Sequence, residues 1–286
     1  MIFVSTGGET KRRVSEVVNE FISNGIEGIE LSGGMYYQNI EKEIIELGRK
    51  ARLQVHNYFP PPKIPFVLNL ASANVGIKNK SIEFIKNSIN LSLKINRPIY
   101  SFHAGFRINP ATKELGNILK KKELIDRKIA LDLFEESVLE LAEYSRKEGV
   151  NLLIENNVIN KVNYKIFKED PLLMTNPDEI EHFMLKMPSN VGLLFDVAHF
   201  KVSGNTLGFN VKNGHLKLKK YIKGYHLSDN DGSLDSNDCF NEDSWFWEDL
   251  NYKLNYYSIE IYRKSIAELV GQYNFVKNII DNHNYE

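Results

Sequence analysis

Residues 192–199 read Gly-Leu-Leu-Phe-Asp-Val-Ala-His, and this stretch decides the fold. The run begins apolar and ends in Asp196 and His199. An apolar run that stops at an acid is typical of a buried parallel strand whose last residues face a site. Because an unpaired buried carboxylate is very costly, Asp196 needs a partner. We expect that partner to be a metal ion or a cationic group.

The same pattern recurs along the chain in short apolar runs that each bring a metal-type ligand to, or near, their C-terminal end. These ligands are His56, His103, Glu155, Asp196, His226 and Glu260. One such run would mean little. Six in series predict a ring of strands whose polar ends meet at one place.

Expected strands alternate with expected helices along the chain. The strands cover residues 2–6, 26–31, 53–59, 97–103, 150–156, 192–199, 223–229 and 256–261, and the helices cover 10–24, 39–51, 81–96, 123–148, 177–186, 216–221 and 264–280. Alternation predicts a parallel sheet, and eight units predict an α/β fold of the single (β/α)8 TIM barrel type. The alternative, an open doubly wound sheet, brings only the strands at its switch point to one ligand.

Length and composition fit one domain over residues 1–286, since such barrels need ~250 residues. The chain has 36 Lys and Arg against 37 Asp and Glu, so it presents no overall field for nucleic acid or an anionic membrane. Its single cysteine, Cys239, excludes an intrachain disulfide. Apolar runs stay well short of the ~20 residues of a membrane span, and the N-terminus lacks a signal pattern. We expect a cytoplasmic protein.

Four motifs in order carry a family resemblance. They are Leu-Ile-Glu-Asn with Glu155, Phe-Asp-Val-Ala-His with Asp196 and His199, His-Leu-Ser-Asp with His226 and Asp229, and Ile-Glu-Ile with Glu260. Each is short, but the ordered set resembles the xylose-isomerase-like barrel superfamily over almost the whole chain. That group includes sugar isomerases and epimerases, inosose dehydratases and the endonuclease IV type of abasic-site nuclease.

The resemblance implies that one divalent metal ion binds Glu155, Asp196, His226 and Glu260. Oxygen and nitrogen ligands without cysteine suit Mn, Mg, Co or Zn, so the identity of the metal stays open. The alternative is that these side chains form ion pairs at the barrel rim. His199 is expected to contact substrate, with a hydrogen bond to a ligand residue as the alternative.

The constellation predicts a metal-dependent isomerase or epimerase for a sugar or sugar phosphate. Lewis-acid polarisation of a carbonyl makes the neighbouring C–H more acidic. Glu155 and Glu260, on strands far apart, would remove and return that proton through an enediolate. Epimerisation, aldose–ketose isomerisation and dehydration of the inosose type stay open. The sequence has no Gly-rich phosphate loop. Whether the sugar carries a phosphate also stays open.

Further residues are predicted to bind substrate, and they are His56, His103, His199, Asp229, Arg107 and Arg263. Some of the resembling epimerases carry an arginine soon after the seventh-strand histidine. Residues 227–232 have none, so Arg107 and Arg263 are the candidates, with surface exposure as the alternative for each. Glu30, near the end of the second expected strand, is either a rim ion pair or part of the site.

The nuclease alternative is weaker. In the resembling nucleases two histidines like His56 and His103 help to hold a three-zinc cluster, but residues 229–238 contain no histidine to complete it. Nucleic-acid binding usually needs clustered Lys and Arg, and the loops after the seventh strand are acidic instead. Their acids are Asp229, Asp231, Asp235, Asp238, Glu242 and Asp243. We therefore predict a small-molecule partner and no nucleic acid.

Residues 230–251 form a polar loop that contains Trp245, Phe246 and Trp247. These aromatic residues predict either a lid over the apolar face of a sugar or a subunit contact in a homodimer. A binding barrel without catalysis is the third functional hypothesis, favoured if the metal ligands fail to converge.

Overall fold

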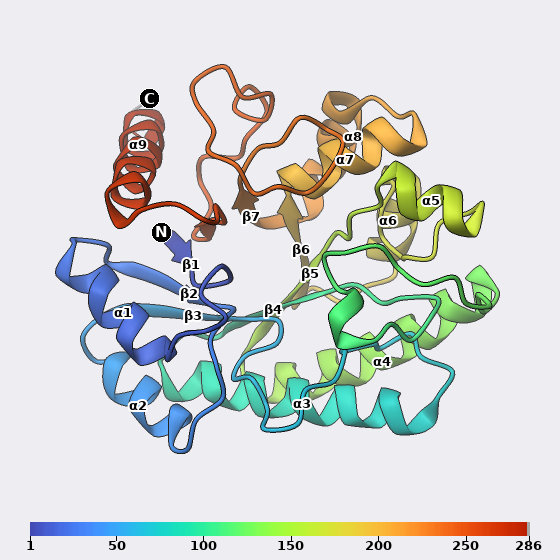
Figure 1. The fold of residues 1–286 in the computed structure, drawn as a ribbon, viewed down its shortest axis with the longest axis horizontal. Coiled ribbons are helices and arrows are strands. Elements are labelled where there is room, and N and C mark those ends of the chain that lie inside the picture. Colours follow the sequence, from blue (N-terminus) through green and yellow to red (C-terminus); the bar gives the residue numbers. More distant parts are fainter. Residues whose placement is uncertain (285–286) are drawn as a thin grey trace.

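The computed structural model describes residues 1–284, and within them parallel strands close into a barrel in the order β1-β2-β3-β4-β5-β6-β7-β8 with helices outside (Figure 1). The strands are Ile2–Ser5 (β1), Gly28–Leu31 (β2), Arg52–His56 (β3), Ile99–His103 (β4), Asn151–Glu155 (β5), Val191–Asp196 (β6), Ile222–Leu227 (β7) and Tyr257–Ile259 (β8). Because β1 pairs with β8, the sheet has no open edge. The predicted TIM barrel is confirmed, and the open sheet is excluded.

The helices are Val14–Ser23 (α1), Ile40–Leu47 (α2), Val75–Lys94 (α3), Arg127–Lys147 (α4), Lys161–Phe167 (α5), Pro177–Met184 (α6), Val197–Leu207 (α7), Val211–Leu218 (α8) and Ile266–Asn284 (α9). Short 3-10 turns cover Thr112–Glu114 (η1) and Lys219–Tyr221 (η2). The last helix, α9, packs against β1, so the C-terminal helix lies beside the N-terminal strand (Figure 1).

Side-chain caps explain where the helices depart from the expectation. α3 begins six residues before position 81, because the Asn74 side chain accepts from the Ile77 N–H. α5 lies inside a segment expected to be a loop and is capped by Asn160. The sixth strand stops at Asp196 rather than continuing to 199, since Asp196 caps α7. Asx side chains at N-caps compete well with strand continuation.

The barrel interior has an apolar floor made by Phe3, Leu153, Leu194 and Tyr256. These residues form a cluster separate from the large core between strands and helices. Alternate residues of a strand share a face, so Leu153 and Glu155 point to the same side, as do Leu194 and Asp196. The floor therefore lies directly beneath the predicted ligands and closes the site from below.

The aromatic residues of the loop before β8 belong to the core. Phe246 is fully buried and Trp247 is 8% exposed, and both rings pack against Phe240. Trp247 also contacts Phe275 of α9. The predicted lid over a sugar is wrong for these two residues, because they anchor the loop on α9 instead.

Among the helices that the structure describes, none combines the length and the apolarity needed to cross a bilayer.

Candidate metal centre

The structure brings the four predicted metal ligands together at the C-terminal end of the barrel. They are Glu155 at the end of β5, Asp196 at the end of β6, His226 in β7 and Glu260 directly after β8. One ligand atom from each lies within 4.8 Å of the others, and all four residues are buried. We call this set the four-residue cluster. It forms because the carboxyl ends of parallel barrel strands face one rim.

Several atoms of the four-residue cluster have no hydrogen-bond partner. Both carboxylate oxygens of Glu155, Oδ2 of Asp196 and Nδ1 of His226 are buried in this state. Nδ1 of His226 lies 2.8 Å from Glu260 Oε2 and 3.3 Å from Glu155 Oε1, yet without hydrogen-bond alignment. Buried polar atoms rarely stay unpaired. Three carboxylates and an imidazole converging in this way fit a divalent cation.

The pKa values in the four-residue cluster are split apart by its crowded charge. Burial raises the pKa of Asp196 to about 8, and the nearby Glu155 charge adds to it against the opposing effect of His199. Burial also raises the pKa of Glu260, but the charge of His226 outweighs the effect of burial and lowers this pKa to about 2. Without a metal the cluster therefore holds protons, which a bound cation would displace.

Three histidines surround Glu155, and they are His56, His103 and His199. His56 Nε2 lies 3.2 Å and His103 Nδ1 3.5 Å from Glu155 Oε2, while His199 Nδ1 lies 3.4 Å from Oε1. His56, His103 and Glu155 also satisfy the spacing of a metal-binding group of their own. His56, His103 and His199, which the sequence predicted to bind substrate, thus lie beside the four-residue cluster.

His199 sits in the first turn of α7 and has partners on both ring nitrogens. Nδ1 lies 2.9 Å from the Asn156 carbonyl oxygen, and Nε2 lies 3.2 Å from Asp235 Oδ2. Its backbone N–H also donates to Asp196 Oδ1 at 2.7 Å. Asp235 was foreseen only as part of an acidic loop, because the contact depends on how that loop folds back.

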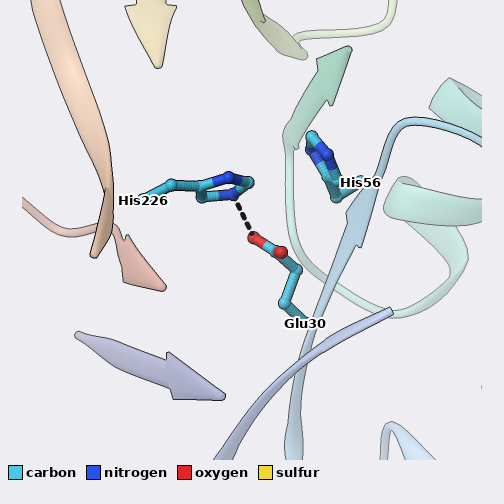
Figure 2. A group of neighbouring side chains, drawn as sticks. All are labelled: Glu30, His56 and His226. Carbon is cyan, nitrogen blue, oxygen red and sulfur yellow. Dashed lines mark hydrogen bonds and ion pairs between the residues drawn. The ribbon is translucent and has the colours of Figure 1, made fainter. Parts of the chain in front are cut away.

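Two residues that complete the surroundings were not assigned from the sequence. The carboxylate of Glu30 is fully buried, with Oε2 3.1 Å from His226 Nε2 (Figure 2), so Glu30 belongs to the site and not to a rim ion pair. The Tyr262 hydroxyl donates to Glu260 Oε1. The Gly7-Gly8 pair makes room for that ring, since a Cβ at Gly7 would lie 2.2 Å from the phenol oxygen.

Arg107 does not reach the four-residue cluster. Its guanidinium donates to the carbonyl oxygens of Ile125 and Asp170 at 3.0 and 2.9 Å and pairs with Glu169 at 2.6 Å. These contacts tie the loop after β4 to the segment before α6. A substrate role for Arg107 stays a prediction, but its Nε and Nη1 donors are occupied.

The other two predicted contacts also point elsewhere. Asp229 accepts from Lys201 at 2.6 Å and from Ser244 at 2.9 Å, which fixes the long loop between β7 and β8. Arg263 is exposed and donates to the Ser236 carbonyl oxygen at 3.0 Å. Their sequence positions placed Arg107, Asp229 and Arg263 near strand ends. The direction in which each side chain points depends on how the loops pack.

The fold and the cluster define a TIM barrel with a candidate metal centre at the C-terminal ends of its strands. The chain belongs to the xylose isomerase-like TIM barrel family, whose model matches residues 19–257.

Individual relatives are distant. The uncharacterized protein MJ1614 of Methanocaldococcus jannaschii is 25% identical over 210 residues, which cover 71% of this chain and 69% of that protein. A structure described as a D-tagatose 3-epimerase-like protein is 19% identical, with a TM-score of 0.74 and coverage of 99% of this chain and 98% of the other. D-psicose 3-epimerase from Clostridium cellulolyticum H10, solved with D-tagatose, is 15% identical, with a TM-score of 0.63 and coverage of 98% and 94%. At these identities the two structures establish the fold alone.

Proposed function

We propose that this protein is a divalent-metal-dependent isomerase or epimerase of a sugar or sugar phosphate. The observation that carries the proposal is the four-residue cluster, whose ligand atoms converge within 4.8 Å and include buried atoms without partners. The names of the similar folds, D-tagatose 3-epimerase-like protein and D-psicose 3-epimerase, support a sugar as substrate.

A bound divalent cation would supply Lewis-acid polarisation of a substrate carbonyl and its neighbouring hydroxyl. Glu155 and Glu260 approach the same point from separate strands, so they flank a carbon held there. Glu155 has no hydrogen bond on either oxygen, whereas Tyr262 occupies Oε1 of Glu260. We therefore assign Glu155 to proton removal and Glu260, through Oε2, to proton return. General bases of this kind supply ~10²–10⁴-fold.

The fate of the proton distinguishes the reactions. Return to the opposite face of the same carbon is epimerisation, and return to the neighbouring carbon is isomerisation. Loss of a hydroxide would make the protein a dehydratase of the inosose type with the same residues. His103, whose side chain is 31% exposed beside Glu155, can donate to a substrate hydroxyl, whereas the buried His56 faces Glu155 through Nε2.

An abasic-site nuclease is the second candidate, because His56, His103 and Glu155 form a further potential metal-binding group. Two features weigh against it. Residues 229–238 offer no histidine beyond this group, and Nε2 of His199 faces Asp235. The surrounding loop is acidic, which disfavours a phosphate backbone.

The test is a screen of ketoses, aldoses, inososes and their phosphates in deuterated water, with chelated and metal-reconstituted protein. We expect solvent deuterium at one substrate carbon, no turnover after chelation, and recovery with Mn, Co or Mg. Glu260→Gln should be inactive, while the exposed Glu242→Gln should match the unmodified protein. Full activity in exhaustively chelated protein would contradict the proposal. Three bound metal ions with incision of abasic DNA would favour the nuclease. The cytoplasmic location and the homodimer remain predictions.

A further inference from the structure

A chain of buried hydrogen bonds runs beneath the four-residue cluster from β2 to β3. Glu30 Oε2 lies 2.5 Å from the Tyr256 hydroxyl, which lies 3.0 Å from Ser101 Oγ, which in turn lies 2.9 Å from His56 Nδ1. A second branch joins the same Glu30 oxygen to His226 Nε2 at 3.1 Å (Figure 2). None of the five side chains is more than 2% exposed. Bulk solvent therefore does not compete with these contacts.

The direction of each hydrogen bond along this chain follows from its chemistry. An ionised carboxylate can only accept, so Tyr256 must donate its single hydrogen to Glu30. The Tyr256 oxygen is then left to accept, and Ser101 donates to it. Ser101 has one hydroxyl hydrogen, so its oxygen accepts from His56. Nδ1 of His56 must therefore carry a hydrogen, whether or not the ring is charged.

The second branch acts on His226 in the same way. Its Nε2 faces Glu30 and must donate, because the carboxylate accepts only. In the neutral ring this leaves the lone pair on Nδ1, the atom that faces the other three residues of the four-residue cluster. Glu30 Oε2 faces both the Tyr256 hydroxyl and His226 Nε2, and one oxygen that receives two hydrogens is the pattern of an ionised carboxylate.

We propose that Glu30 is a positioning residue that fixes the hydrogen positions of both His226 and His56. Through one oxygen it places a hydrogen on Nε2 of His226 directly and on Nδ1 of His56 by way of Tyr256 and Ser101. The lone pair of His226 is thereby aimed at the candidate metal centre, and Nε2 of His56 is turned toward Glu155. The effect on metal affinity rests on the proposed function, whereas the hydrogen positions do not.

A metal ion held by Glu30, His56 and His226 themselves is the competing interpretation, since these residues also meet the spacing of a metal-binding group. The geometry disfavours it. Glu30 Oε2 already accepts two hydrogens, and His56 Nδ1 is occupied by Ser101. A cation bound through Glu30 Oε2 or His56 Nδ1 would have to break the hydrogen-bond chain, whereas Glu30 Oε1 is buried without a partner.

The experiment compares two variants with matched controls. Glu30→Gln removes the charged acceptor, and its control is Glu27→Gln, an exposed acid just before β2 that pairs with Arg52. Tyr256→Phe cuts only the branch to His56. Its control, Tyr257→Phe, removes a neighbouring buried tyrosine hydroxyl that donates to the Asn251 carbonyl oxygen instead. Thermal unfolding checks that each variant folds.

Manganese affinity is measured by titration, and imidazole hydrogens are located by nitrogen-15 NMR in metal-free and zinc-loaded protein. Glu30→Gln should weaken manganese binding ~10–100-fold, the usual effect of losing a carboxylate that orients a metal-binding histidine. Tyr256→Phe should leave the His226 hydrogen on Nε2 and release the His56 hydrogen from Nδ1. Both controls should match the unmodified protein.

Two results would overturn the inference. One is manganese affinity in Glu30→Gln equal to that of the unmodified protein, and the other is His56 without a hydrogen on Nδ1 in the unmodified protein. If the unmodified protein binds no manganese, zinc, cobalt or magnesium, the proposed function fails instead. The NMR of the metal-free protein then still decides the hydrogen-bond chain. If Glu30→Gln does not fold, Tyr256→Phe tests the same chain with a smaller change.

Discussion

Two groups of buried charged side chains lie in this protein. They differ in whether the chain itself supplies enough positive charge to pair with the carboxylates. The four-residue cluster has three carboxylates around one imidazole, with buried atoms that lack partners. The second group, here called the paired cluster, consists of Arg127, Asp170 and Glu179, with Arg107 and its partner Glu169 next to them. Within it Arg127 binds Glu179 through two hydrogen bonds of 2.6 and 2.9 Å, and Thr175 donates to Asp170.

The difference separates function from structure. A buried charge that is paired with another side chain of the protein holds a loop in place and requires no ligand. A buried set of carboxylates without cations is costly unless something outside the chain supplies positive charge. Arg107 illustrates the first case, because its proximity to a strand end suggested a substrate contact while its donors bind Glu169 and the carbonyl oxygens of Ile125 and Asp170.

The largest expected effect is at Glu155. Glu155→Gln should lower turnover by ~10²–10⁴-fold, because it removes the proposed base and one metal ligand. In metal-free protein the same change should lower the free energy of unfolding by less than the ~3 kcal/mol of a broken buried pair, since this carboxylate repels Asp196 and Glu260 as well as attracting the histidines. Solvent deuterium incorporation and denaturant unfolding measure the two effects. A strongly destabilised metal-free variant would mean that Glu155 is a structural ion pair.

The opposite pattern is expected for the paired cluster. Arg127→Met leaves Glu179 and Asp170, which are only 10% and 8% exposed, without their cation. Breaking such a pair should cost about 3 kcal/mol of unfolding free energy, near the low end for buried pairs because Arg127 is 29% exposed. Turnover at saturating substrate should stay unchanged at a temperature where the variant is folded. A large loss of turnover would erase the distinction between the clusters.

The sequence predicted the strands and the convergence of their ends well, because buried parallel strands leave continuous apolar runs that stop at polar residues. Helices α5 and α7 were missed as regular elements and α8 begins five residues before the expected position 216, since Asn and Asp caps look like loop residues until the following turns are counted. Glu30 stayed ambiguous, and Tyr256 and Tyr262 gave no signal, because their roles depend on contacts between strands distant in the sequence. The occupied donors of Arg107 were hidden for the same reason.

The pKa values of two histidines, one inside the four-residue cluster and one outside both clusters, extend the comparison to pH. His226, among acids, has its pKa raised well above the usual value, even though burial opposes this. His215 lies outside both clusters, stacked on Phe195 with Nε2 2.9 Å from the Tyr225 hydroxyl, and burial lowers its pKa to about 4. Between pH 6.5 and 4 the unfolded chain binds this proton and the folded chain does not. His215 therefore contributes stability above pH 6.5 that is lost as the pH falls toward 4.

We expect His215→Gln to flatten this part of the stability profile by roughly 2–3 kcal/mol, because about 1.36 kcal/mol corresponds to each pKa unit. The measurement is the free energy of unfolding from pH 7 to 4 in the presence of chelator. His182→Gln, at an exposed position of α6, is the control and should leave the slope unchanged. An unchanged slope in His215→Gln would show that His215 titrates normally.

The smallest effect is expected at Asp229, which lies at the rim of the site but is paired like the second cluster. Its carboxylate binds Lys201 and Ser244, and its backbone pairs with Asp238 across the loop. Asp229→Asn keeps the shape and loses a partly exposed ion pair, which is worth about 1 kcal/mol or less. The KM for the substrate should not change, and Asp231→Asn, an exposed acid that hydrogen-bonds Ser233, is the control. A KM raised tenfold or more in Asp229→Asn alone would return Asp229 to the substrate-binding role that its sequence position suggested. Pairing within the chain would then not be sufficient to mark a buried or rim charge as structural.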